Sequence, residues 1–345
     1  MKIRYLTTAC LMGSLMSIFL LVSCSGGGGK ADEDTTAIKE EEKVTLQACP
    51  TFDENSAYNF VKAQVDFGPR VPNTASHRKC GDYLISQLKN FGWDTLAQNF
   101  DAIAYNGTVL KSRNIIGVFN PKATTRILLA AHWDTRPFND KEVEDSTQFK
   151  PIDGANDGAS GVGILLEIAR VVGQAKNKPS VGIDIIFFDS EDYGHPENFK
   201  GDWKPDLWCL GAQHWAKNPH QANYTAYYGI LLDMVGARGA TFYREGQSMK
   251  FAPKIVNQVW QIANQLGYIN FFKFQNSPEI TDDHVYVNQL AKIPMIDIIE
   301  YAPTNPSYFG DYHHTSKDNM ELIDAKTLKA VGQTVLQTLY NESAQ

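Results

Sequence analysis

The sequence contains five continuous apolar runs, rich in β-forming residues, and longer stretches between them carry apolar residues at helical spacing. Continuous runs are typical of strands buried on both faces, because a half-exposed strand alternates apolar and polar residues. This order predicts an α/β protein with an open, twisted, mostly parallel central sheet and helices on both faces. The predicted strands are 114–119, 126–131, 183–189, 229–234 and 295–299, and the predicted helices are 160–172, 252–266 and 325–340.

Polar residues follow the predicted strands at the points where those strands end. In open parallel sheets, ligands bind beyond the carboxyl ends of the strands. A single Asp at the start of a loop is usually a cap or a turn former, but four polar clusters at successive strand ends are hard to attribute to caps alone. The sequence therefore predicts a functional site at this edge. The clusters are His132-Trp133-Asp134, Asp189-Ser190-Glu191-Asp192, Asp233 and Tyr312-His313-His314-Thr315, and a small-residue turn before the helix at 160 presents Asp157.

The residue types in these clusters indicate which metal would bind. Asp and His ligands without cysteine suit a catalytic zinc ion, which keeps three protein ligands and one open position. Calcium would require more oxygen ligands and no imidazole. Cys49, Cys80 and Cys209 form no CxxC pair, so a cysteine zinc site is not expected, and one disulfide among the three stays open. The adjacent Glu191 and Asp192 suggest that one carboxylate binds the metal while the other moves protons.

Five motifs together resemble the zinc aminopeptidase superfamily, which also contains the animal-type glutaminyl cyclases. They are HWD, GANDGASG, FFDSED, LLDMVGA and HHTSKDN, and the resemblance extends from about Tyr58 to the C-terminus. It implies that Asp157, Asp192 and His314 bind zinc. It also implies that Glu191 is the general acid and base.

Two enzyme classes of this superfamily fit these residues, an aminopeptidase and a glutaminyl cyclase. In the two-zinc aminopeptidases, His132 and Asp233 would help to hold a second metal. The TDDH segment favours the cyclases, because it resembles their QDDH segment with Thr in the first position. There Asp282 would contact the substrate amide, and His284 would belong to the surrounding hydrogen-bond network. The LWCLG sequence at 207–211 also resembles the cyclases, and in this interpretation His132 and Asp233 form hydrogen bonds beside the substrate.

Further positions bear on the substrate pocket. Phe309 stands where an aromatic residue lines the pocket of the cyclases, and Trp203 would supply an indole to the pocket wall. Three positions depart from the animal enzymes. Asp192 stands where they have Glu, His313 where they have Trp, and Ala131 where they have a disulfide cysteine. The departures point to a bacterial branch of this cyclase type.

The resemblance implies a glutaminyl-peptide cyclotransferase, which converts the N-terminal glutamine of peptides and proteins to pyroglutamate and releases ammonia. The reaction is intramolecular, because the α-amine attacks the γ-amide of the same residue. No water needs activation, so one zinc ion per chain, acting as a Lewis acid, suffices. Glu191 would carry the proton from the amine to the departing ammonia, and Asp282 would hold the amide with support from Asp233. The alternatives are a periplasmic two-zinc aminopeptidase and, from another class, an inactive binding module.

The N-terminus resembles a bacterial lipoprotein signal. Lys2 and Arg4 precede an apolar run that is too short to span a membrane comfortably, and the run ends in a lipobox-like Leu-Val-Ser-Cys at Cys24. The protein would then be exported, face the periplasm and be anchored by lipid to a bacterial membrane. The predicted divisions are a signal peptide over 1–23, a lipidated cysteine and flexible linker over 24–48, and a single catalytic domain over 49–345.

Composition adds little about partners. The formal net charge of −7 is scattered along the chain, and no basic patch indicates nucleic-acid binding. The expected partners are peptides and proteins that begin with Gln. Membrane contact is expected through the lipid anchor only, and the chain is expected to be a monomer.

Overall fold

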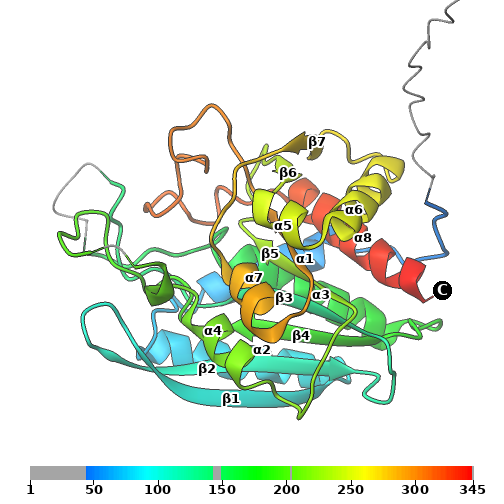
Figure 1. Cartoon of the computed structure of the whole chain (residues 1–345), viewed down its shortest axis with the longest axis horizontal. Coiled ribbons are helices and arrows are strands. Elements are labelled where there is room, and N and C mark those ends of the chain that lie inside the picture. The colour runs from blue at the N-terminus through cyan, green and yellow to red at the C-terminus, as the bar shows by residue number, and fades with distance from the viewer. Residues whose placement is uncertain (1–43, 143–148, 203, 344–345) are drawn as a thin grey trace, which may run out of the picture. The chain divides into compact units, whose positions relative to one another are not determined.

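Six strands form the central sheet of the protein (Figure 1). The structure is a computed structural model that describes residues 44–142, 149–202 and 204–343. In spatial order the strands are β1 (Asp94–Ile103), β2 (Val109–Phe119), β4 (Gly182–Phe188), β3 (Arg126–His132), β5 (Tyr228–Asp233) and β8 (Met295–Ile299). The last four run parallel, whereas β2 is antiparallel to both of its neighbours. A separate pair of short strands is formed by β6 (Phe242–Arg244) and β7 (Phe272–Asn276).

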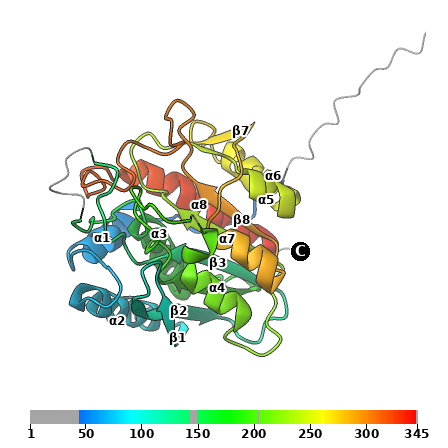
Figure 2. The ribbon, with the colours of Figure 1, turned by 60° about the vertical axis from the view of Figure 1, so that its left-hand side comes forward.

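Helices cover both faces of this sheet. One face carries α1 (Glu54–Val65), α2 (Ala75–Asn90), α3 (Ala159–Gln174) and α8 (Ala325–Glu342), and the other carries α4 (Leu210–Lys217) and α7 (Asp283–Tyr286). In Figure 2, α1 and α2 lie on the left, α4 and α7 lie to their right, and β2 lies between α2 and α4. At the β8 edge, α5 (Gly246–Phe251) packs against the sheet and α6 (Pro253–Gln265) packs against α8.

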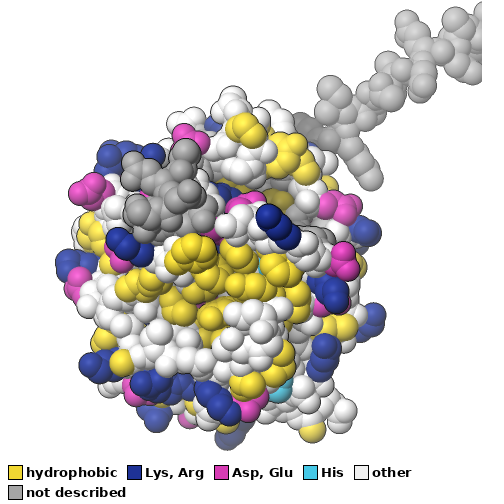
Figure 3. Space-filling model, turned by 90° about the vertical axis from the view of Figure 1, so that its left-hand side faces the viewer, with side chains coloured by type: hydrophobic (Ala, Val, Ile, Leu, Met, Phe, Trp, Pro, Cys, Tyr) yellow, Lys and Arg dark blue, Asp and Glu magenta, His cyan; other side chains and the backbone are white. Residues whose placement is uncertain are grey.

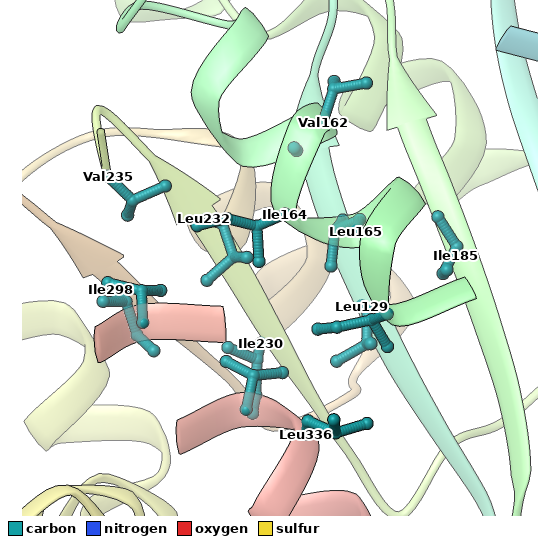
Figure 4. Packing of buried hydrophobic residues seen from close by; sticks show 14 of the residues in the cluster. Leu129, Val162, Ile164, Leu165, Ile185, Ile230, Leu232, Val235, Ile298 and Leu336 are labelled. Carbon is teal, nitrogen blue, oxygen red and sulfur yellow. The ribbon is translucent and has the colours of Figure 1, made fainter. Parts of the chain in front are cut away.

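Alternate residues of the parallel strands enter two different hydrophobic clusters. On β3, Leu129 packs beneath α3, whereas its neighbours Leu128 and Ala130 face the side of α4 and α7. Figure 4 shows Leu129 and Ile185 from the sheet beneath side chains of α3. Because both faces are covered, every position of β3 is buried, and this explains the continuous apolar run in the sequence.

The predicted fold is confirmed, including all five predicted strands and all three predicted helices, with ends shifted by a few residues. The segments that pattern reading missed have weaker periodicity. In β1, the burial pattern is mostly exposed or half-buried, because this strand forms the open edge of the sheet. The first predicted strand, β2, differs in direction from the other four, and sequence periodicity carries no signal for strand direction.

Several sequence predictions lie at the margin of the described residues or outside them. The signal peptide over 1–23, Cys24 and Trp203 lie outside the described residues. Within the predicted linker, Gln47 donates its backbone N–H to Asn341 of α8. The cysteines Cys49, Cys80 and Cys209 are free thiols, so the disulfide left open by the sequence is absent among them. No helix within 44–142, 149–202 and 204–343 is long and apolar enough to cross a membrane.

Candidate active site

The parallel strands bring their polar ends level with one another. His132, the last residue of β3, is in register with Phe188 at the end of β4. Asp233 ends β5 and is in register with Ile299 at the end of β8. The strand-end clusters seen in the sequence therefore meet at one edge of the sheet.

A tight turn before α3 presents Asp157. Gly158 has a φ of +94°, and a Cβ at this position would lie 2.8 Å from the carbonyl oxygen of Asp134, so only glycine fits. The carboxylate of Asp318 accepts the backbone N–H groups of Asn156 and Asp157, at 2.7 and 3.0 Å. These bonds fix the turn, so the Asp157 side chain points to the edge of the sheet with little freedom.

A second turn, after β4, presents the adjacent acidic pair. The two carboxylate oxygens of Asp134 accept the backbone N–H groups of Glu191 and Asp192, at 3.0 and 3.2 Å. Ser190, immediately before the pair, has a φ of +57°, which the surrounding hydrogen bonds hold in place. The motif HWD thus contributes His132 to the site directly, and its Asp134 holds the turn that carries Glu191 and Asp192.

The three predicted zinc ligands come together. His314 Nε2 lies 3.2 Å from Asp192 Oδ1 and 3.6 Å from Asp157 Oδ2. Ligand atoms about 2.0–2.2 Å from a tetrahedral zinc ion lie roughly 3.4 Å from one another, so the two spacings from His314 suit that geometry. All three side chains are buried. His313 also lies here, because single ligand atoms of Asp157, His313 and His314 are within 4.8 Å of one another.

The electrostatics of these ligands also favour a cation. Neither carboxylate oxygen of Asp192 receives a hydrogen bond from the described residues, and the nearest guanidinium nitrogen of Arg136 is 3.6 Å away. Burial, and then the charge of Asp157, raise the pKa of Asp192 well above its usual value. Burial lowers the pKa of His314 well below its usual value, which keeps the imidazole in the neutral form that binds metals. The residues present therefore fit a zinc ion.

His132 joins a neighbouring cluster. Its Nε2 lies 3.0 Å from Asp157 Oδ1 and 3.2 Å from Asp233 Oδ1. Burial opposes a charge on His132, but hydrogen bonds with the surrounding carboxylates raise its pKa well above the usual value. Burial raises the pKa of Asp233 to about 7, against the hydrogen bond with His132. The spacing suits a hydrogen-bonded imidazole, and it also suits a second metal.

Glu191 lies beside the predicted ligands and faces the cavity. Burial, and then the negative charges of Asp192 and Asp282, raise the pKa of Glu191 well above its usual value, against the opposing charge of His132. One of its oxygens, Oε1, accepts a hydrogen bond from the thiol of Cys209 at 3.3 Å. A carboxylate with a raised pKa suits a group that takes up and releases a proton near neutral pH.

Asp282 stands at the start of α7, inside a group of buried acids. Its carboxylate oxygen accepts the backbone N–H of Asp283, as the helix cap that its position suggests. Burial, and then the charge of the nearby Asp282 among others, raise the pKa of Asp297 well above its usual value. His284 Nε2 lies 3.1 Å from Glu245 Oε2, and its Nδ1 lies 3.7 Å from Asp297 Oδ2. His284 is therefore hydrogen-bonded to Glu245, whereas Asp297 lies just beyond hydrogen-bond distance.

A cavity of about 420 Å³ opens over these groups. The predicted pocket residue Phe309 lines it, and the indole that forms part of its wall belongs to Trp208. Trp208 is stacked on His314, with ring centroids 6.1 Å apart, and the Arg136 guanidinium lies 4.8 Å from its ring. The loops that follow β4 and β8 lie at the left in Figure 1, and Figure 3 shows apolar side chains gathered on that face.

Comparison with known proteins places this site in a family. The model of "Peptidase family M28" matches residues 114–339, which is more than half of the chain. The chain belongs to peptidase family M28.

Members of this family with solved structures cover almost the whole described part of the chain. A glutaminyl cyclase from Bacteroides thetaiotaomicron, bound to N-acetylhistamine, is 53% identical with a TM-score of 0.83, and the match covers 85% of this chain and 99% of that one. A Zn-dependent exopeptidase from Parabacteroides distasonis is 56% identical with a TM-score of 0.83, and the match covers 85% and 100%. The glutaminyl-peptide cyclotransferase of Drosophila melanogaster is 27% identical, and the match covers 75% and 73%. The resemblance to the glutaminyl cyclases inferred from the motifs is confirmed.

Within this M28 site, the sequence patterns did not reveal three residues, Asp297, Trp208 and Glu245. Asp297 interrupts the apolar run of β8, and a charge inside a strand expected to be buried was a signal for it. Trp208 stood inside the LWCLG segment, one residue from Cys209. Glu245 had no comparable signal, because a Glu before a short helix is ordinarily a cap, and here it also caps α5.

Proposed function

We propose that this protein is a glutaminyl-peptide cyclotransferase with one catalytic zinc ion per chain, acting on peptides and proteins that begin with Gln. One observation carries the proposal beyond family membership. A carboxylate oxygen of Asp282, one of Glu191 and the Cys209 sulfur lie within 4.8 Å of one another. A second acid so close to the general base provides an acceptor for an amide N–H, which water-activating chemistry does not require.

Asp157, Asp192 and His314 would hold the zinc ion. When bound there, the ion supplies Lewis-acid chemistry at the γ-carbonyl oxygen of the substrate. The backbone N–H groups of Asp157 and Asp192 donate to the carboxylates of Asp318 and Asp134, so the main chain that carries these ligands is held in place before the ion binds.

The chain's own residues account for the proton transfers. Glu191 would take a proton from the substrate α-amine and return it to the departing ammonia, a cycle that its raised pKa suits. Asp282 would accept a hydrogen bond from the γ-amide nitrogen and orient that group. The hydrogen bond that Asp282 accepts from the backbone N–H of Asp283 would hold Asp282 in place. Orientation has a large effect, because the nucleophile and the carbonyl belong to one residue.

The decisive experiment measures two products from the purified full-length chain. Incubation with a Gln-peptide should release ammonia. The product peptide should be lighter by the mass of ammonia, and no free amino acid should appear. Leucine p-nitroanilide should remain uncleaved. Cleavage without ammonia release would overturn the proposal.

A two-zinc aminopeptidase is the second candidate, because the atoms of His132, Asp157 and Asp233 that would bind a second metal lie within 4.8 Å of one another. The Zn-dependent exopeptidase relative is consistent with it. Metal analysis separates the two candidates. About one zinc ion per active chain supports the cyclase, and about two support the peptidase.

We also propose that the chain is exported, anchored by lipid at Cys24 to a bacterial membrane facing the periplasm, and monomeric. The lipobox-like sequence supports the anchor. Exported proteins that begin with Gln would be its substrates. Labelled fatty acid should enter the wild-type chain and not Cys24→Ser, and the wild-type chain should sediment with membranes while Cys24→Ser does not.

A further inference from the structure

Cys209 contacts the general base of the proposed reaction at two points. Its backbone N–H donates to the carbonyl oxygen of Glu191 at 3.0 Å. Its thiol donates to Oε1 of the same residue at 3.3 Å. Cys209 is fully buried, so the thiol has no competing contact with bulk water. One cysteine thus holds both the main chain and the side chain of Glu191.

The fold fixes the position of this thiol. Cys209 has a φ of +54° and immediately precedes α4. The next residue, Leu210, donates its N–H to the carbonyl of Ser190 at 3.1 Å, and Gln213 donates to the carbonyl of Cys209 at 3.0 Å. The start of α4 is therefore tied to the turn that carries the acidic pair. The left-handed conformation also excludes β-branched residues at this position.

The chemistry of a thiol suits this place. Burial, and then the negative charge of Glu191, raise the pKa of Cys209 well above its usual value, so the sulfur stays protonated and acts as a donor. A thiol is a weak donor. It can restrict the orientation of a carboxylate while leaving most of that group's capacity to accept a proton.

We propose that Cys209 is a positioning residue for catalysis, which holds Oε1 of Glu191 so that the other carboxylate oxygen is free to exchange a proton with the substrate. The role rests on the proposed function, in which Glu191 moves the proton. It assigns no metal binding and no nucleophilic role to the sulfur.

Three single variants test this role in the full-length chain. Cys209→Ala removes the hydrogen-bond donor, and Cys209→Ser keeps one. Cys80→Ala is the control, because it removes a buried thiol on α2. We expect Cys209→Ala to lower kcat about three- to tenfold, the equivalent of one modest hydrogen bond, with KM within about twofold of wild type. Cys209→Ser should recover part of kcat, and Cys80→Ala should leave it unchanged.

Zinc content and melting temperature separate positioning from structural damage. If Cys209→Ala keeps wild-type zinc content and loses kcat, the proposal is supported. A loss of zinc that matches the loss of kcat, an unchanged kcat, or a serine variant no better than alanine would each overturn it.

A double-mutant cycle provides a second, independent test. Glu191→Asp shortens the carboxylate arm, so its oxygens no longer reach the thiol. In that background, Cys209→Ala should have no further effect on kcat, whereas an equal loss in both backgrounds would show that Cys209 acts elsewhere. If the wild-type chain cleaves leucine p-nitroanilide and releases no ammonia, the cyclase proposal fails. The same cycle on that substrate still decides whether Cys209 acts through Glu191.

Discussion

His314 presents its neutral Nε2 atom 3.2 Å from an oxygen of Asp192 that receives no hydrogen bond from the described residues. A buried anion without donors beside a neutral imidazole is stable when a cation completes the group. We therefore expect His314→Ala to lose zinc, so that metal content measured by mass spectrometry falls from about one ion per chain to near zero. Cyclisation should be lost with the metal.

Glu191→Gln should show the opposite pattern. Its side chain is outside the predicted ligand set, so zinc content should match wild type while kcat falls by at least about a hundredfold, as expected for removal of a general acid and base. The two variants are compared in the same preparation, by metal content and ammonia release. Zinc loss in Glu191→Gln together with zinc retention in His314→Ala would reverse these role assignments.

Removal of zinc should also lower stability. Without the ion, the carboxylates of Asp157 and Asp192 are buried close together, and none of the described residues donates a hydrogen bond to the Asp192 carboxylate. An ion present at about a hundred times its dissociation constant contributes roughly 2.7 kcal/mol, so a chelator should lower the Tm of a domain of about 290 residues by about 4–5 °C. Calorimetry with and without chelator measures this, and added zinc should restore Tm. The His314→Ala variant is the control, because its Tm should not respond to chelator.

Asp282→Asn tests the residue that separates the cyclase from the peptidase interpretation. The substitution keeps the shape of the side chain but removes its negative charge and replaces one of its two acceptor oxygens with an NH2 donor group. We expect kcat/KM for a Gln-peptide to fall by about a hundredfold with unchanged zinc content, consistent with loss of a charged hydrogen bond in a buried site. Asp94→Asn, at an exposed position of β1, is the matched control. Near-normal rates in Asp282→Asn would remove the main argument for cyclisation.

The fold was largely predictable because the sheet is buried on both faces. Every residue of β3 and β4 is buried, so the strands appear in the sequence as unbroken apolar runs. The two antiparallel strands at the open edge carry a weaker signal, and the direction of β2 has none. Short helices such as α7, with four residues, are too brief for periodicity to reveal.

The site was predictable to the extent that its residues follow strands. Asp157, Asp192 and His314 meet because the carboxyl ends of parallel strands share one edge. Asp297 and Glu245 reach the site from within a strand and from a helix cap, and such contacts depend on tertiary packing.

Trp208→Ala should weaken substrate binding more than it slows the reaction. The indole lines the cavity, is stacked with His314 and lies 4.8 Å from the Arg136 guanidinium. Loss of an aromatic contact of about 1–1.5 kcal/mol corresponds to a roughly tenfold rise in KM, with kcat changing much less. Trp208→Phe should keep most of the affinity, and Tyr227→Ala, at an exposed position outside the cavity, should have no effect. Equal losses in kcat and KM would instead indicate damage to the zinc site.

The buried pair of Glu245 and His284 should make stability depend on acid pH. Burial opposes the charge of Glu245, but the hydrogen bond with His284 and bonds from backbone N–H groups lower its pKa from 4.5 to about 2. A carboxyl whose pKa is lower in the folded state contributes stability above pH 4.5, and that contribution is lost as the pH falls towards 2. Urea unfolding at several pH values should show Glu245→Gln less stable than wild type by about 3 kcal/mol at pH 7, with the difference narrowing steadily below pH 4.5. Glu321→Gln, at an exposed position, should follow wild type, and a difference that stays constant with pH would show that Glu245 stabilises the fold by packing rather than by charge.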